Sequence, residues 1–176
     1  MKKRNHAIFL STCAILSAFS IIFGKYLALN LGTNIRFSLE NLPILLAGLY
    51  LGPAAGAIVG TVADLLGCLL VGFSINPIIT FGAMCIGLIS GLAGKFCGKR
   101  KIFTLAVATA FSHLIGSVLI KSMGLYIYYG SPLLLVTAQR LGIYICTGSI
   151  EFIILLLLSK NKGFVKQMNK IRFKEG

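Results

Sequence analysis

Long apolar runs separated by short polar breaks make up most of the chain. A helix needs about 20 mostly apolar residues to cross a bilayer, and six segments between the polar breaks are candidates. The candidate spans are residues 7–29, 40–51, 54–71, 77–96, 102–120 and 133–158. The second is short, and Pro53 closes it because proline cannot continue a helix. The pattern predicts an all-α integral membrane protein, a bundle of six transmembrane helices.

Composition excludes an ordinary soluble domain. With 57% apolar residues, 12% charged residues and a mean hydropathy of +0.91, 176 residues cannot hide so much apolar surface from water. Its net charge of +13 does not indicate nucleic-acid binding, because the basic residues interrupt apolar runs rather than line a helix face. We therefore expect one transmembrane domain over residues 1–176, with a basic leader at 1–6 and a basic tail at 159–176.

The basic residues predict an orientation. Thirteen of the 17 lysines and arginines lie at residues 2–4, 95–101 and 160–174. Cytoplasmic loops carry the excess of such residues, and a six-span path places these three stretches on one side, so both termini are predicted to be cytoplasmic. If the first span were a cleaved signal peptide, five spans would remain, and the basic stretches at 95–101 and 160–174 would lie on the opposite side of the membrane. The remaining cations are Lys25, Arg36, Lys121 and Arg140, and Lys25 is expected to extend to the membrane interface.

Polar and small residues recur at helical spacing along four of the predicted spans. Positions three, four, seven and eleven apart share one face of a helix, so each set is expected to face the bundle interior. The sets are Gly52, Gly56, Gly60 and Asp64; Asn76, Thr80, Ala83, Gly87 and Gly91; His113, Ser117 and Lys121; and Thr137, Arg140, Tyr144, Thr147 and Glu151.

Charged side chains inside the membrane need partners or a function. Each costs about 2.5–3.5 kcal/mol near the bilayer centre. Asp64, Arg140 and Glu151 are therefore each expected to have a partner or a function that offsets this cost. One interpretation is a structural ion pair between Asp64 and Arg140. A polar pocket reached from outside fits better, because Arg140, His113, Asp64 and Asn76 fall in the outer half of the bundle. Glu151 lies in the inner half, where a structural or partner-facing role is expected.

Small residues also form a stripe on the first span, at Ala7, Ser11, Ala14 and Ala18. Small residues four apart let helices approach closely in lipid. For the glycines of the third span, packing within the chain is expected. For the first span, internal packing and contact with a partner membrane protein both remain open.

Motifs of common enzymes are missing from the sequence. It has no complete phosphate-binding G-x-x-x-x-G-K-[ST] loop, no H-E-x-x-H motif, no nucleophile elbow and no metal-ligand cluster. We expect no ATP hydrolysis by this chain, no catalytic residues, no metal and no cofactor. Two other classes stay open: a small intramembrane enzyme that uses Asp64, His113 or Arg140, and a purely structural subunit.

The segments RFSLENLPILLAGL (36–49) and GPAAGAIVGTVADLLG (52–67) resemble the substrate-binding S components of energy-coupling factor (ECF) vitamin transporters. Ala14-x-x-x-Ala18 matches the motif with which that family docks on its transmembrane coupling subunit. The motifs INP (75–77), HLIGS (113–117), IKSMGL (120–125) and YYGSP (128–132) look most like the folate-specific member. The likeness covers residues 7–151.

The resemblance implies a bacterial plasma-membrane subunit that binds folate at its outer face. It also implies a coupling subunit, docked at Ala14 and Ala18, and two cytoplasmic ATPases as partners. Arg36, Lys121 and Arg140 could neutralise the anionic glutamate tail, and aromatic rings could stack on the pterin. The expected substrate-binding residues are Arg36, Phe37, Asp64, Asn76, His113, Lys121, Tyr126, Tyr128, Arg140 and Tyr144. An S component for thiamin, riboflavin or a pyrimidine precursor is the alternative.

Overall fold

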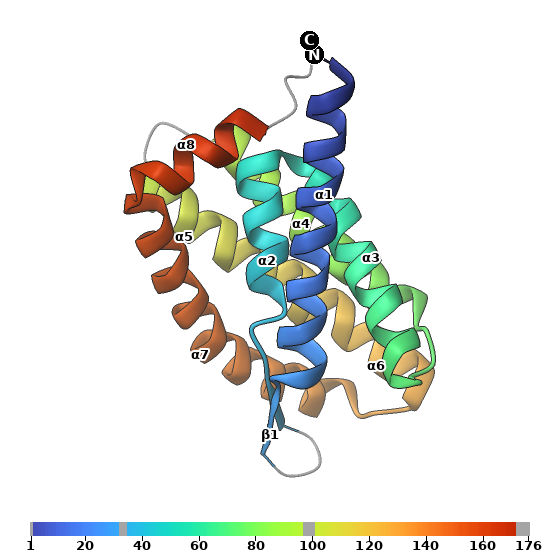
Figure 1. Ribbon diagram of the computed structural model, residues 1–176. Helices are drawn as coiled ribbons and strands as arrows, with labels where there is room; N and C mark the ends of the chain where they lie inside the picture. Colours follow the sequence, from blue (N-terminus) through green and yellow to red (C-terminus); the bar gives the residue numbers. More distant parts are fainter. Residues whose placement is uncertain (1, 32–34, 97–100, 172–176) are drawn as a thin grey trace.

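The computed structural model describes residues 2–31, 35–96 and 101–171, and most of them are helical (Figure 1). In chain order the elements are α1 (Lys2–Ile21), η1 (Ile22–Tyr26), β1 (Leu29–Leu31), β2 (Ile35–Phe37), α2 (Asn41–Leu46), η2 (Ala47–Leu51), α3 (Pro53–Val71), α4 (Pro77–Phe96), α5 (Lys101–Phe111), η3 (Ser112–Ile120), α6 (Lys121–Tyr129), α7 (Leu133–Lys160) and α8 (Lys162–Ile171). The η elements are π-helical turns that continue the α-helices beside them.

All six predicted segments are helical, and five helices within the described residues are long and apolar enough to cross a membrane. The remaining one, Asn41–Leu51, is shorter. Residues 41–48 are all buried, and Leu45 and Ala47 are fully so. A short helix that is apolar all round is typical of a protein core, so the other helices surround this one.

Helices α3 and α4 pack with their backbones almost in contact. A methyl group added at Gly56 would collide with the backbone of Gly87, and one added at Gly60 would collide with Ala83. Small residues permit this approach where lipid removes the usual hydrophobic drive for helix association. The prediction that the third-span glycines pack within the chain is confirmed.

The fifth helix is longer than predicted. It runs from Lys101 to Tyr129 without leaving the helical path, so the expected outer loop at 121–132 is mostly helix. Lys121 does not end the helix, because its aliphatic stem packs against Gly82 of α4 and its ammonium group has a carboxylate partner in Glu40. A lysine stem can be buried in this way when its charge is compensated.

A small antiparallel hairpin, absent from the all-α prediction, joins the first two helices. Strand β1 pairs with β2 so that Leu29 lies opposite Phe37 and Leu31 opposite Ile35. The sequence carries a hairpin signal that was missed, since Gly32-Thr33-Asn34 separates two short apolar stretches. In Figure 1 the hairpin projects from one end of the bundle.

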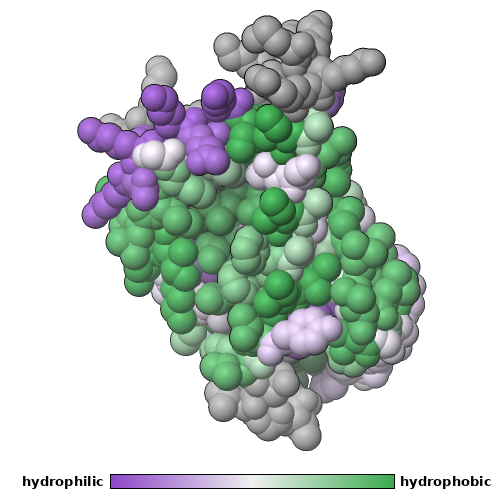
Figure 2. Space-filling view, viewed as in Figure 1, coloured by the Kyte–Doolittle hydropathy of each residue, from purple (hydrophilic) through white to green (hydrophobic). Residues whose placement is uncertain are grey.

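The opposite end carries the start of α1 and an additional helix, α8 (Figure 1). The basic tail was not predicted to be helical, but Lys162–Ile171 forms α8 and lays Phe164 edge-on against Tyr50 at 5.6 Å. Lys162, Lys166 and Lys170 are exposed on it. In Figure 2 hydrophilic side chains gather at this end, whereas the sides of the bundle in this view are largely hydrophobic.

Candidate functional site

The candidate site is a cluster of charged side chains inside the hairpin end of the bundle. It lines a small cavity between η1, the start of α2, and helices α3, α4 and α6. The cavity residues are Ser20, Ile21, Gly24, Lys25, Glu40, Ile44, Gly60, Ala63, Asp64, Ala83 and Lys121. Two lysines and two carboxylates therefore face one enclosed space, and its volume is about 20 Å³. That is room for about one water molecule, so a vitamin can enter only if the side chains move.

Lys121 is the centre of this cluster. Only 4% of its surface is exposed, and its Nζ donates a hydrogen bond to Glu40 Oε1 at 3.1 Å. Glu40 precedes α2, and 25% of its side chain is exposed. Burial of a lysine charge requires such a partner. Sequence reasoning did not assign Glu40, although it is one of only four acidic residues in the chain and begins a predicted span.

Asp64 and Lys25 complete the charged wall. Thr80 of α4 donates its hydroxyl to Asp64 Oδ2 at 2.6 Å, so the carboxylate is hydrogen-bonded but points to the cavity. Lys25 was expected to extend to the membrane interface without a function. In the structure it lines the same cavity, with Nζ 5.5 Å from the centre of the Phe73 ring. The Asp64–Arg140 ion pair considered from the sequence is replaced by other partners for both residues.

Asn76 holds two helices at this end of the bundle. Its Oδ1 accepts hydrogen bonds from the backbone N–H groups of Ile78 and Ile79, which caps α4. Its Nδ2 donates to the carbonyl of Gly124 on α6 at 3.0 Å. The Asn76 side chain thus ties the start of α4 to α6, the helix that continues for eight residues after Lys121.

A second polar group lies deeper, between η3 and α7. His113 Nε2 is 2.5 Å from Glu151 Oε2, and the His113 ring stacks on Tyr144 with centroids 5.0 Å apart. Arg140 donates to the backbone carbonyl of Ser117 at 3.1 Å. His113, Ser117 and Lys121 are all buried, as their spacing predicted. The expected structural role of Glu151 is supported by its bond to His113.

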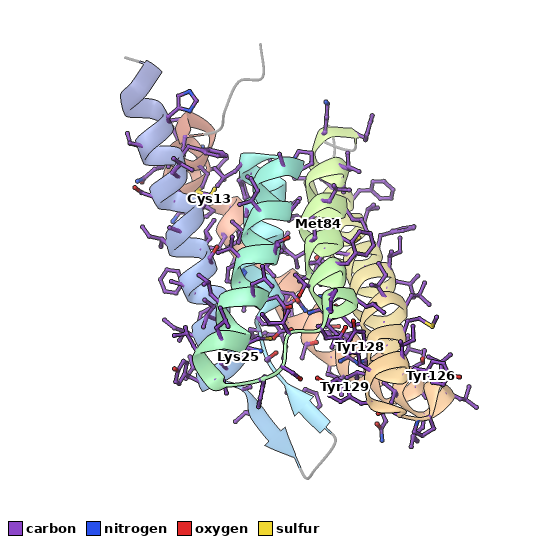
Figure 3. The ribbon with its side chains drawn as sticks, turned by 90° about the vertical axis from the view of Figure 1, so that its right-hand side faces the viewer. Cys13, Lys25, Met84, Tyr126, Tyr128 and Tyr129 are labelled. Carbon is purple, nitrogen blue, oxygen red and sulfur yellow. The ribbon has the colours of Figure 1, made fainter. Side chains whose placement is uncertain are left out.

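The predicted aromatic residues do not gather at the cavity. Tyr126 and Tyr128 are about half exposed on α6, and Tyr129 contacts Ser74 at 3.2 Å through its hydroxyl. Figure 3 shows these tyrosines and Lys25 at the same end of the molecule. Phe37 is half-buried at the end of β2. Arg36 belongs to β2, but its side chain lies outside the part of the chain that the structure describes.

A hollow much larger than this cavity is an apolar groove of about 560 Å³ between α5, η3 and α7. His113 and Tyr144 lie on its wall, but small and aliphatic residues such as Ala106, Ala110 and Ile145 dominate it. A charged ligand needs counter-charges and hydrogen-bond partners. We therefore place the candidate site at the smaller charged cavity.

The comparisons with known proteins identify the family and the fold. The model of the family described as ECF transporter, substrate-specific component, matches residues 9–160. No curated protein sequence matches the chain significantly.

Three solved structures share the fold. The crystal structure of FolT bound with folic acid has a TM-score of 0.70 and 23% identity, over 86% of this chain and 92% of FolT. The S component for biotin from an ECF-type ABC transporter has a TM-score of 0.67 and 21% identity, over 93% of this chain and 97% of its own. The S component of a bacterial ECF transporter, whose structure and mechanism were described together, has a TM-score of 0.67 and 24% identity, with the same coverage. The chain is an integral membrane protein of the ECF transporter S component family, the substrate-binding subunits of vitamin transporters.

Proposed function

We propose that this chain is the folate-binding S component of an ECF transporter. The observation that carries the proposal is the buried Lys121, which lies at the hairpin end and is held by one carboxylate in a cavity that also contains Asp64. Such a site suits a ligand with an anionic end and a polar ring edge. The folate-like motifs of the sequence and the fold shared with FolT support folate as that ligand.

Folate offers complementary chemistry. Its glutamate tail carries two carboxylates, for which Lys121 is the best-placed cation and Arg36 and Arg140 are further candidates. The edge of its pterin presents N–H groups that a carboxylate such as Asp64 can accept. Lys121 and Asp64 both line the cavity, so we propose direct contact for these two.

The other predicted residues have supporting places in the proposal. Asn76 and His113 already bond to Gly124 and Glu151, so we propose that they position α6 and η3 around the ligand. The aromatic side chains of Phe37, Tyr126, Tyr128 and Tyr144 would stack on the ligand rings once the site opens.

The whole chain would form one domain with six spans and cytoplasmic termini in the bacterial plasma membrane. The cytoplasmic placement of the termini is supported by the start of α1 and α8, which lie at one end of the bundle (Figure 1). Lys101 lies beside Ser159 and Val165 at that same end. Lysines gathered there fit the positive-inside rule. ATP hydrolysis would be the work of two partner ATPases, reached through the coupling subunit.

Calorimetry on the purified protein tests the substrate. Folate is titrated into protein freed of co-purified ligand, beside biotin, thiamin and riboflavin, and the released ligand is identified by mass spectrometry. We expect heat with folate and recovery of a pterin. Heat with biotin alone would indicate that the chain binds biotin, as the similar S component for biotin does. Turnover of a lipid substrate by the chain would instead support the enzyme interpretation.

The proposed docking helix can be tested separately. Ala14 and Ala18 are exposed on α1. Ala18→Trp should abolish folate uptake by cells that contain the whole transporter, while calorimetry on the purified chain still shows folate binding. A matched change on the same helix, Phe19→Trp, adds little bulk at another exposed position and should preserve uptake. Joint loss of uptake and binding after Ala18→Trp would mean that this face packs internally.

A further inference from the structure

The junction between the start of α2 and the start of α6 has an unusual balance of charge. Among the residues that the structure describes, the cavity holds Lys25 and Lys121 against Glu40 and Asp64, so the formal charges of these four sum to zero. Within this set, the Lys121 ammonium group is bonded to the Glu40 carboxylate at 3.1 Å. A carboxylate from a ligand would have to share Lys121 with Glu40 or replace it.

Sharing is unfavourable in this position. Lys121 is 4% exposed, and two carboxylates close together in a poorly solvated space repel each other strongly. The cavity of about 20 Å³ also has no room for a second carboxylate beside the first. Exchange is therefore the route by which an anionic ligand can reach Lys121.

We propose that Glu40 is an intramolecular competitor for the ligand carboxylate: it occupies Lys121 until the ligand displaces it, and so sets the affinity for anionic vitamins. The inference rests on the proposed function, because it needs an anionic vitamin at Lys121. The chemical class of ligand is a monoanion or dianion whose carboxylate takes the position of the Glu40 side chain.

The Glu40 backbone is tied in place, whereas its side chain is partly exposed. Ser20 of α1 donates its hydroxyl to the Glu40 carbonyl at 2.6 Å, which ties the backbone to the first helix. The side chain is 25% exposed, compared with 5% for that of Lys121. Glu40 lies a few residues after Phe37, where strand β2 ends.

Two buried polar side chains directly follow the paired residues in the sequence. Asn41, which follows Glu40, is 0% exposed, and neither its Oδ1 nor its Nδ2 has a hydrogen-bond partner among the described residues. Ser122, which follows Lys121, is also 0% exposed, and within the part of the chain that the structure describes its hydroxyl has no partner. Buried polar groups normally find partners.

The test compares a charged ligand with a matched neutral one. Folate and its α,γ-diamide are titrated into wild type, Glu40→Gln and Glu40→Asp by calorimetry. Removing the competing charge should tighten folate binding by about tenfold in Glu40→Gln, whereas the diamide should change by less than about twofold. Glu40→Asp keeps the charge on a side chain one methylene shorter, which reaches Lys121 less well, so its folate affinity should fall between those of wild type and Glu40→Gln.

Weaker folate binding by Glu40→Gln would overturn the inference, because it would make Glu40 a direct ligand contact. An equal change for folate and the diamide would overturn it as well. Infrared spectra of wild type labelled with ¹³C-glutamate give a reading without any variant: folate should shift a protein carboxylate band, and an unchanged spectrum counts against displacement.

Failure of the folate proposal is separable from failure of this inference. If wild type binds biotin and not folate, the folate assignment is wrong, and the same comparison with biotin and biotinamide decides the role of Glu40. Binding of neither folate nor biotin would overturn both.

Discussion

Two buried acid–base pairs in this bundle have similar chemistry but different surroundings. His113 and Glu151 have side chains 5% and 0% exposed and lie 2.5 Å apart between η3 and α7. Lys121 and Glu40 lie 3.1 Å apart, and the Glu40 side chain is 25% exposed. Both partners of the first pair are buried, although His113 borders the apolar groove, and the second pair has one partly exposed partner. The difference teaches that solvent access, more than the presence of a buried charge, separates a structural pair from one that a ligand can exchange.

The physical reason lies in what remains when one partner leaves. An unpaired charge in a sealed position keeps its full desolvation penalty. A partly exposed carboxylate can turn toward water, and its ion pair contributes less. Glu151 has no such outlet, and its Oε1 has no hydrogen-bond partner among the described residues.

The largest expected effect comes from removing the base of the His113–Glu151 pair. His113→Leu should lower the free energy of unfolding by about 3 kcal/mol, because it leaves the carboxylate of Glu151 buried without a partner. The matched change, Lys121→Leu, leaves Glu40 with access to water and should cost about 1 kcal/mol. Denaturant titration in detergent micelles measures both. Equal losses would break the distinction between the two pairs.

Ligand binding should respond in the opposite order. Lys121→Gln should weaken folate binding about 30-fold, near 2 kcal/mol, because a charge-assisted hydrogen bond to the ligand is lost. Lys101→Gln removes an exposed lysine at the other end of the bundle and is the control. Calorimetry on the two variants measures the effect. Similar folate affinity in both would remove Lys121 from the proposed site.

Much of the interior could be predicted from residue spacing. His113, Ser117 and Lys121 lie four apart on a helix, and all three are buried. The same argument placed Thr147 and Glu151 inside, because a polar stripe on an otherwise apolar membrane helix must avoid lipid. Helical periodicity is local, so one sequence is enough to reveal it.

Pairing between distant segments could not be predicted in the same way. Lys121 and Glu40 are 81 residues apart, and nothing in either helix indicates the other. Lys25 was assigned to the membrane interface, since the sequence does not show that the helix turns it toward Asp64. Tyr126 and Tyr128 are exposed because the helix continues past Lys121. That extension depends on the contact between Lys121 and Glu40, which the sequence does not reveal.

The smallest expected effect is the coupling between the two pairs. His113 and Lys121 are eight residues apart on one helix, about 12 Å along its axis, and Ser117 lies between them with its hydroxyl 3.4 Å from His113 Nδ1. That distance is long for a hydrogen bond of this type, so the connection is weak. In the double variant of His113→Leu with Lys121→Leu, the two losses in unfolding free energy should add within about 0.5 kcal/mol. Adding Ser117→Ala to each single variant is the control. A coupling of about 1 kcal/mol or more that Ser117→Ala removes would mean that Ser117 joins the His113–Glu151 pair and the exchangeable pair into one network.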